Sequence, residues 1–286
     1  MAKGISIHVG LNTIDPKHYG TTGDLPYCVN DAKEMRKLAI AEGYQVQDIL
    51  LNKEATAANI LMAFIKASER LEAGDKLLFT YSGHGSYFPD LNGDEDDKYD
   101  ETWVLYDRMM IDDELYYSLS KFRRGVRIVL ISDSCHSGTV AKPLIMSNGG
   151  IEFSDKRKLN IPERKVLVEI LKSEAEMLYK RHKALYDPHL KFIPSSKDLT
   201  IQASVILLAA SQDDQLSMGV SRTGRKLSLF TDELITVYMK QKTGMNYKRF
   251  VAEIKKRIPA KYRQTPNYFE TGIRNEAFLN ERPFTI

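Results

Sequence analysis

Four short apolar segments constrain the fold of this chain more than any other feature of its sequence. They are residues 5–11 (ISIHVGL), 76–83 (KLLFTYSG), 126–134 (VRIVLISDS) and 204–211 (SVILLAAS). Each is rich in β-branched or large apolar residues and runs into Gly, Ser, Asp or Asn, which is typical of a buried parallel strand. Two segments with helical spacing, 30–43 and 56–74, lie between the first two and end at glycines. Strands that alternate with helices predict an α/β fold with a mostly parallel central sheet flanked by helices.

The length of the chain fits one domain with a large core. It has 286 residues, of which 43% are apolar and 28% charged, the balance of an ordinary globular protein. We expect a single domain made of two core parts, 1–140 and 201–286, with a basic insertion, 141–200, between the third and fourth strands. In the insertion, a helical pattern covers 162–186 and starts at a proline. Two further prolines then break the segment 187–198.

Composition and charge limit the classes of partner. The formal net charge of +3 is too small to indicate nucleic-acid binding. No stretch reaches the roughly 18 apolar residues of a membrane-spanning helix, and residues 1–10 lack the apolar region of a signal peptide. The two cysteines, Cys28 and Cys135, stand in unrelated contexts, so we expect free thiols in a reducing, cytoplasmic compartment. Neither nucleic acid nor a membrane is an expected partner.

Polar clusters follow the second and third predicted strands. Residues 82–85 (SGHG) come after one and residues 132–138 (SDSCHSG) after the other, so His84 and Cys135 should meet at the same edge of the sheet. An imidazole can take the proton of a thiol and later return one to a leaving amine, which predicts a Cys-His nucleophilic pair. The backbone amides of Gly85 and Cys135 are the natural donors to a substrate oxyanion.

Two other interpretations compete with a catalytic role of His84 and Cys135. A lone cysteine and a lone histidine are usually inert, although here both stand at strand ends between Ser and Gly. A zinc site is disfavoured because His136 is adjacent to Cys135 and no second Cys or His group has ligand spacing. The remaining histidines have no partner pattern and are expected to pack or to lie on the surface; they are His8, His18, His182 and His189.

The two polar motifs together resemble a known family. YSGHGS at 81–86, followed about fifty residues later by SDSCHSG, is similar to the p20 region of the caspase clan. The flanking residues resemble metacaspases and bacterial orthocaspases, since the Gln-Ala-Cys signature of animal caspases is absent. Further matches are LPYCVNDAKEM, GDEDDKYDE with IDDEL, and LLAASQDDQLS with LSLFTDELI. The resemblance implies a caspase-like (caspase-hemoglobinase) fold, in which 1–140 is p20-like and 201–286 is p10-like.

The resemblance also implies an activity: a cysteine endopeptidase with Cys135 as nucleophile and His84 as base, cleaving after Arg or Lys. The matching residues of its P1 pocket are Cys28, Asp31, Ser82 and Asp133. Two carboxylates would hold a cationic side chain and repel an acidic one. Simpler roles stay open, because Asp31 fits a helix start and Asp133 fits a turn. The rivals are a non-catalytic caspase-like module that binds partners, and a caspase-type protease specific for Asp.

An acidic stretch, 89–101, invites a calcium interpretation. EF-hand spacing starts at Asp90, but Glu95 stands where that loop needs glycine. In metacaspases an activating Ca²⁺ site instead matches Asp100, Asp112 and Asp113 here. One further aspartate of that pattern is replaced by Lys142, which would oppose a cation. Ca²⁺ is therefore expected at most as an activator, not for the chemistry, and a solvated acidic loop is the alternative.

The insertion suggests regulation. An enzyme that cleaves after Lys or Arg could cut itself near residues 156–158 (KRK), as a zymogen would. The segment could otherwise be a lid, a docking helix for a protein activator, or an inert excursion. Near the C-terminus, 246–264 has the pattern of a basic amphipathic helix that packs one face on the sheet.

Overall fold

We describe a computed structural model of the chain, which covers residues 2–89, 99–134, 172–191, 193–194, 198–210, 223–240, 244–262 and 264–286. Cys135 and the segment 156–158 lie outside these residues, as do His136, Lys142 and the middle of the acidic stretch. The side chain of His189 is not described either.

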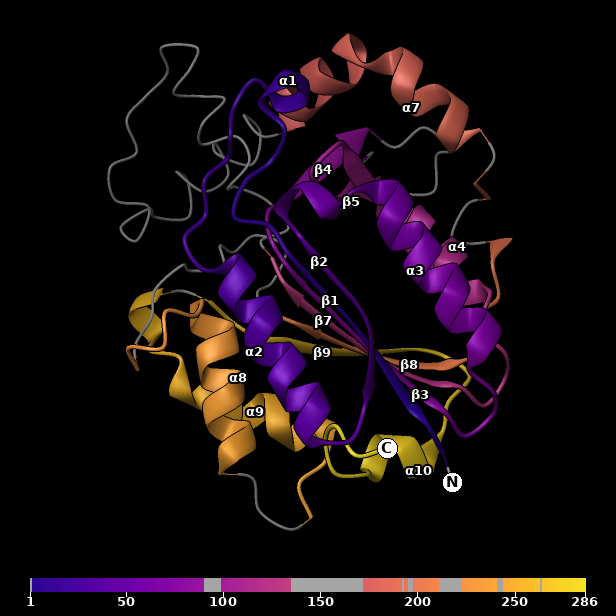
Figure 1. Ribbon diagram of the computed structural model, residues 1–286, viewed down its shortest axis with the longest axis vertical. Helices are drawn as coiled ribbons and strands as arrows, with labels where there is room; N and C mark the ends of the chain where they lie inside the picture. The colour runs from indigo at the N-terminus through magenta and orange to yellow at the C-terminus, as the bar shows by residue number, and fades with distance from the viewer. Residues whose placement is uncertain are drawn as a thin grey trace.

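A six-stranded sheet forms the centre of the molecule, with strand order β2-β1-β3-β7-β8-β9 (Figure 1). Its strands are β1 (Gly4–Gly10), β2 (Gln45–Leu51), β3 (Lys76–Ser82), β7 (Arg127–Asp133), β8 (Ser204–Ala209) and β9 (Asn267–Gly272). The first five run parallel and β9 pairs antiparallel with β8. This confirms the predicted fold class and the four apolar strands. The sequence prediction missed β2 and β9, which lie at the sheet edges and are half exposed, so neither has a continuous apolar run.

A small antiparallel sheet lies beside the central one. It consists of β4 (Gly85–Pro89), β5 (Tyr99–Val104) and β6 (Met109–Ile111). Because only Gly83 and His84 separate the end of β3 at Ser82 from the start of β4 at Gly85, the chain turns from the central sheet into the small one at His84. This turn holds the candidate base.

Helices cover both faces of the central sheet (Figure 1). On one face lie α3 (Ala57–Arg70) and α4 (Asp112–Ser120). On the other lie α2 (Cys28–Ala41), α8 (Leu229–Met239) and α9 (Tyr247–Arg257), with α10 (Glu276–Asn280) nearby. The short α1 (Pro16–Tyr19) lies near α7 (Lys183–Leu190). No helix in this described part of the chain is long and apolar enough to cross a membrane.

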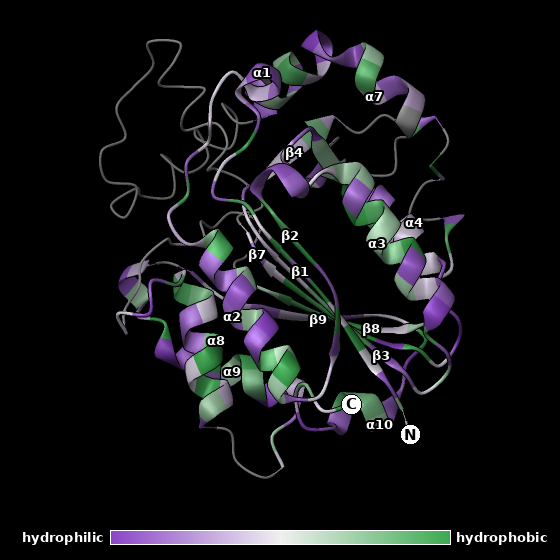
Figure 2. Cartoon of the chain, viewed as in Figure 1, coloured by the Kyte–Doolittle hydropathy of each residue, from purple (hydrophilic) through white to green (hydrophobic). Residues whose placement is uncertain are grey.

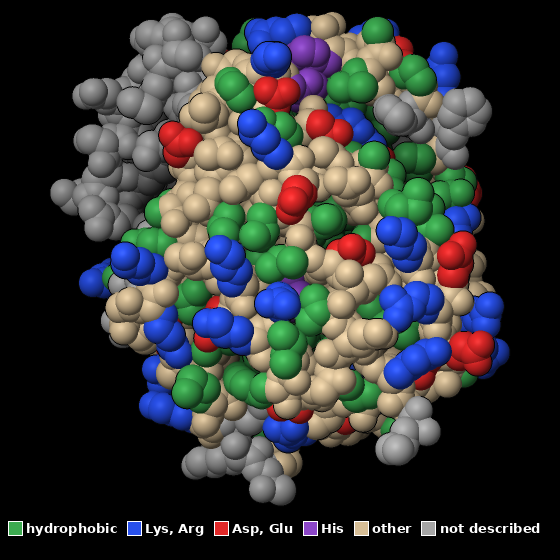
Figure 3. Space-filling view, viewed as in Figure 1, with side chains coloured by type: hydrophobic (Ala, Val, Ile, Leu, Met, Phe, Trp, Pro, Cys, Tyr) green, Lys and Arg blue, Asp and Glu red, His purple; other side chains and the backbone are tan. Residues whose placement is uncertain are grey.

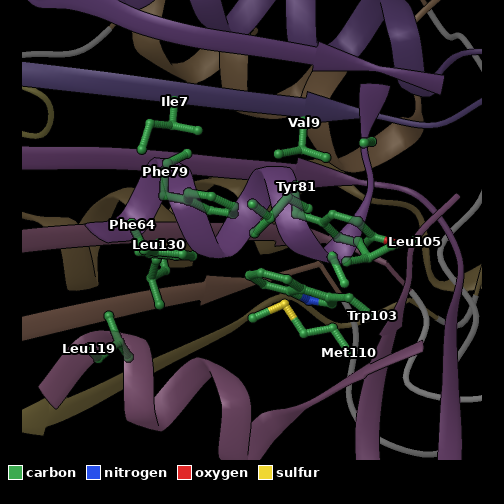
Figure 4. Packing of buried hydrophobic residues seen from close by; sticks show 14 of the residues in the cluster. Ile7, Val9, Phe64, Phe79, Tyr81, Trp103, Leu105, Met110, Leu119 and Leu130 are labelled. Carbon is green, nitrogen blue, oxygen red and sulfur yellow. The ribbon is translucent and has the colours of Figure 1, made fainter. Parts of the chain in front are cut away.

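The alternation of side chains along the strands divides the core into two layers. Ile7, Phe79 and Leu130 belong to the layer under α3 and α4, where the Phe79 ring stacks with Trp103 of the small sheet (Figure 4). Their strand neighbours, such as Leu78 and Val129, belong to the layer under α8 and α9. Strands buried on both faces read as continuous apolar runs, which is why they stood out in the sequence (Figure 2).

The predicted C-terminal amphipathic helix is confirmed as α9. It buries Tyr247, Phe250, Val251 and Ile254 and exposes Lys255 and Lys256. Elsewhere on the face seen in Figure 3, Lys and Arg side chains are spread out with Asp and Glu among them.

The described part of the insertion packs against the core. Residues 172–181 and α7 are helical, and Leu178 and Tyr186 are buried. The Tyr186 hydroxyl accepts a hydrogen bond of 3.1 Å from the amide of Met109 on β6. The helix α7 continues through Pro188 to Leu190, where the sequence predicted a break. The packing of Tyr186 and its neighbours stabilises this turn of helix against the proline.

Two histidines lie where the insertion meets α1. His18 Nε2 lies 2.9 Å from the Tyr186 hydroxyl, and His182 Nε2 donates to the carbonyl oxygen of His18 at 3.0 Å. The hydroxyl has one hydrogen and two lone pairs, so it can donate to a neutral His18 Nε2 while it accepts from Met109. Burial, then the charge of His182, lowers the pKa of His18 to about 4.

We expect this contact to weaken in acid. Between pH 6.5 and 4 the unfolded chain binds a proton at His18 and the folded chain does not, so stability falls as the pH falls. Urea unfolding from pH 4 to 7.5 should show a shallower pH slope for His18→Gln than for the wild type. His8, whose pKa burial lowers to about 3, is present in both proteins and cancels from the comparison. Parallel slopes would contradict this role of His18.

Candidate active site

The predicted site residues gather at the carboxyl edge of the central sheet. Ser82 at the end of β3 is the register partner of Asp133 at the end of β7. The amide of Gly83 donates to the carbonyl oxygen of Asp133 at 3.3 Å. His84 follows directly and is 2% exposed, and Cys135 comes two residues after Asp133, beyond the described part of the strand.

A backbone carbonyl orients the His84 ring. His84 Nε2 lies 2.6 Å from the carbonyl oxygen of Gly23, in the loop between α1 and α2. A carbonyl oxygen can only accept, so Nε2 carries the proton and the neutral ring has its lone pair on Nδ1. Nδ1 is therefore the nitrogen that can act as a base.

Gly23 itself is a testable part of this arrangement. Its φ is +53°, and an added Cβ would lie 2.7 Å from the Ile14 side chain and 3.2 Å from His84 Nε2. We expect Gly23→Ala to lower kcat on a peptide substrate by about tenfold or more, because the base would lose its orientation. The matched control is Gly74→Ala, at φ +91° with nothing within 4 Å of the added Cβ. It carries a similar backbone strain of about 1–2 kcal/mol and should keep kcat; equal losses in both would contradict the role of Gly23.

Two aromatic residues of the core hold the two strand ends. The Tyr81 hydroxyl lies 2.7 Å from the carbonyl oxygen of His84, and a Cβ on Gly83 would clash with that hydroxyl at 2.5 Å. Trp103, which stacks on Tyr81 at 4.7 Å between ring centroids, donates from Nε1 to Ser132 Oγ at 3.0 Å. The hydroxyls of Ser132 and Ser134 are 2.8 Å apart. One aromatic stack therefore connects the His84 turn to the residues just before Cys135 (Figure 4).

The predicted P1 residues Asp31, Ser82 and Asp133 come together, although they are far apart in sequence. Ser82 Oγ donates to Asp31 Oδ2 at 2.8 Å. Asp31 and Asp133 are 1% and 4% exposed, and we call them the acid pair. Cys28 lies one turn before Asp31 on α2 and is also buried. It forms no disulfide in the part of the chain that the structure describes.

A glycine on β1 allows α2 to come this close to the sheet. An added Cβ on Gly10 would lie 2.4 Å from the carbonyl oxygen of Cys28 and 2.9 Å from the Ala32 side chain. The first turn of α2, which carries Asp31, therefore lies directly against the end of β1. This explains how a helix-start carboxylate becomes part of the site.

Ser228 and Thr231, at the start of α8, hydrogen-bond to the acid pair. The Ser228 amide is 2.9 Å from Asp31 Oδ1, and its Oγ is 2.7 Å from Asp31 Oδ2. The same hydroxyl also hydrogen-bonds Asp133 Oδ2. Thr231 donates to that oxygen from Oγ1 at 2.6 Å and from its amide at 3.2 Å. Burial, and then the charge of Asp133, raise the pKa of Asp31 to about 8, against the opposing effect of the bonds from Ser228 and Ser82.

The predicted calcium residues do not form a site in the described part of the chain. Asp100 on β5 and Asp113 on α4 line one cavity of about 350 Å³, but Asp112 does not, and Lys191 does. The described residues contain no group of three or more His, Cys, Asp or Glu that could hold a metal ion. Asp187 lines the same cavity, and a role of Ca²⁺ as an activator stays a prediction. Glu101 lies in strand β5, so the exit helix of an EF-hand is absent there.

Four functional residues were not predicted from the sequence. Gly23 lies in no motif, whereas Tyr81 and Ser228 lie in YSGHGS and LSLFTDELI, two motifs that carry the resemblance but assign no role to either residue. The contacts of all three become visible only in the fold. Trp103 is the single tryptophan of the chain, a signal that could have drawn attention to it. Of the histidines expected to pack or to lie on the surface, His8 and His18 are buried. His8 Nδ1 lies 2.9 Å from Thr80 Oγ1.

Comparisons with known proteins agree with this architecture. Residues 13–278 match the family described as "Caspase domain". "Metacaspase-1" of Emericella nidulans is 29% identical over 285 aligned residues, which cover 90% of this chain and 68% of that protein. "Metacaspase-1" of Botryotinia fuckeliana is 28% identical, covering 90% of this chain and 65% of that protein. The chain thus spans about two thirds of the length of these relatives.

Solved structures give the same fold. The crystal structure of protein GSU0716 from Geobacter sulfurreducens has a TM-score of 0.78 and 38% identity, covering 99% of both chains. Caspase-1 from Spodoptera frugiperda has a TM-score of 0.50 at 12% identity, covering 95% of this chain and 86% of that one, and shows the fold alone. The chain belongs to the caspase domain family. Within it, the chain is of the metacaspase type, a cysteine-type peptidase and thus a hydrolase.

Proposed function

We propose that the chain is an endopeptidase that cleaves after Arg or Lys, with Cys135 as nucleophile and His84 as general base. The single observation that carries the specificity is the buried acid pair at the carboxyl edge of the sheet. A cationic P1 side chain can be held there by charge-assisted hydrogen bonds, and an acidic one is repelled. The side chains that shift the pKa of Asp31 are Asp133, Ser228 and Ser82, and none of them is the cation that an Asp-specific pocket needs.

The proposed chemistry uses the orientation of His84. Nδ1 takes the thiol proton of Cys135, and the sulfur attacks the scissile carbonyl carbon. The amides of Gly85 and Cys135 stabilise the oxyanion. The imidazolium then returns the proton to the leaving amine, which leaves a thioester, and water hydrolyses the thioester by the same proton route. The bond from Nε2 to the carbonyl oxygen of Gly23 holds the ring through both steps.

One panel of fluorogenic peptides tests this proposal. Matched peptides with Arg, Lys or Asp at P1 are incubated with the wild type and with Cys135→Ala, each with Ca²⁺ and with a chelator. We expect turnover of the Arg and Lys peptides by the wild type alone. Turnover of the Asp peptide would favour a caspase-type specificity, and no turnover in any arm would favour the non-catalytic module. The two calcium arms decide whether Ca²⁺ acts as an activator, which the residues around Asp100 and Asp113 do not settle.

Self-cleavage is a further part of the proposed activity. If the enzyme cuts after Lys or Arg in its own insertion, the wild type should produce new N-termini near residues 156–158 on incubation. Cys135→Ala should stay intact under the same conditions, and N-terminal sequencing distinguishes the two. Identical fragments from both proteins would show cleavage by a contaminant and would overturn self-processing.

A further inference from the structure

The hydrogen atoms between Asp31, Asp133 and Ser228 do not suffice for two ionised carboxylates. Ser228 Oγ hydrogen-bonds Asp31 Oδ2 at 2.7 Å and also Asp133 Oδ2. A serine hydroxyl has one hydrogen, and an ionised carboxylate has none. Of the two contacts, Ser228 donates one, so the other needs a hydrogen from a carboxyl group. The geometry thus favours one extra proton among the three side chains, because a single hydrogen divided between two carboxylate oxygens would leave both contacts weak.

The described donors to the acid pair are neutral. Ser82 from β3 and the Ser228 amide from α8 donate to Asp31, and Thr231 donates to Asp133. The titratable and charged groups on the elements packed against the pair are Cys28 on α2, His84 after β3, Lys226 before α8, and Asp232 on α8, which pairs with Arg225 at 2.8 Å. The two carboxyl groups are buried beside each other, where two negative charges are unfavourable.

We propose that Asp31 and Asp133 share one proton through the Ser228 hydroxyl when no cation is bound, and that a Lys or Arg side chain at P1 displaces this proton. The displacement rests on the proposed P1 specificity; the shared proton does not. Without a bound cation, the acid pair carries one negative charge. When the P1 cation enters, one proton leaves the acid pair to solvent. Ser228 is a positioning residue, which keeps the two carboxyl groups bridged until the cation arrives. The raised pKa of Asp31, about 8, agrees with this reading of the geometry.

A first experiment tests the shared proton without any substrate. Urea unfolding of Cys135→Ala and of Cys135→Ala with Asp31→Asn is followed from pH 4 to 9. The folded state holds the proton up to about pH 8 and the unfolded state only to about 4, so the parent should lose stability relative to the Asn variant as the pH rises through this window. A difference between the two proteins that does not change with pH would overturn the shared proton.

A second experiment tests the displacement. Calorimetry of Cys135→Ala with a tripeptide amide ending in Arg, in buffers of different ionisation heat, should show release of about one proton at pH 6.5 and almost none at pH 9. The same peptide ending in citrulline, which is neutral and of the same shape, should release none. In the active enzyme, KM for an Arg peptide should rise about tenfold for each pH unit below 8 through this site, while kcat does not follow it.

Two substitutions of Ser228 test its role by proton release and by the pH dependence of KM. Ser228→Thr keeps the hydroxyl and should leave the proton release and the pH dependence of KM as in the parent. Because the Ser228 hydroxyl lowers the pKa of Asp31, Ser228→Ala should keep the proton release at pH 6.5 and move the rise of KM to a higher pH. Binding of the Arg peptide without any proton release would overturn the displacement. If the Arg peptide does not bind although the pH slope of the first experiment is present, the P1 specificity fails and the shared proton stands.

Discussion

His84→Ala is expected to lower kcat for an Arg peptide by about 10²–10⁴-fold, the usual contribution of a general base. The ring is buried, oriented by Gly23 and placed on the turn that connects the two sheets. Without it, neither the thiol of Cys135 nor the leaving amine has a proton carrier. Steady-state kinetics on the wild type and the variant measure the effect.

His182→Gln is the control for this change, since it replaces another partly buried histidine in the part that packs on α1. It should leave kcat within a few-fold of the wild type. If His84→Ala keeps more than a tenth of the wild-type kcat, another group acts as the base, and His136 beside Cys135 becomes the next candidate.

Asp31→Asn and Asp133→Asn are each expected to lower kcat/KM for Arg and Lys peptides by about 10–100-fold or more. A hydrogen bond to a charged group contributes about 1.5–3 kcal/mol, and 1.4 kcal/mol corresponds to a factor of ten. Asparagine keeps the shape and most hydrogen-bond positions of aspartate, so the loss should come from charge and not from unfolding. Kinetics on Arg and citrulline peptides, with urea unfolding alongside, measure the two contributions.

The ratio of the two peptides is the decisive quantity. If the acid pair binds the P1 cation, the Arg peptide should lose much more than the citrulline peptide. Asp198→Asn, at an exposed carboxylate, should change neither. Equal losses on both peptides would assign the carboxylates to structural support, namely the helix-start role for Asp31 and the turn role for Asp133.

The sheet was predictable because its strands are buried on both faces. Four of the six strands are continuous apolar runs, because a strand that is buried on both faces carries mostly apolar side chains. The edge strands β2 and β9 have one exposed side and follow no such rule. The helices α2 and α9 were found near their true bounds by apolar spacing, whereas the persistence of α7 through Pro188 depends on the packing of Tyr186.

The active-site motifs were predictable for a related reason. In a parallel sheet, strand ends at one edge are neighbours, so His84 and Asp133 could be placed together from their positions after two strands. The family resemblance added Asp31, Ser82 and Cys28. The structure brings Asp31 and Ser82 into contact with the same group of side chains.

By itself, the sequence determined the class of fold and the candidate pair of His84 and Cys135, because both depend on local pattern and strand order. The candidate acidic residues of the P1 pocket came from the family resemblance. Only the tertiary structure decided which groups orient and join these residues. Gly23 meets His84 across 61 positions of sequence, and Ser228 meets Asp31 across 197. Such contacts come from the packing of loops and helix ends on the sheet edge. No periodicity or spacing in the chain encodes these contacts. They include the Ser228 bridge between the buried carboxyl groups of Asp31 and Asp133.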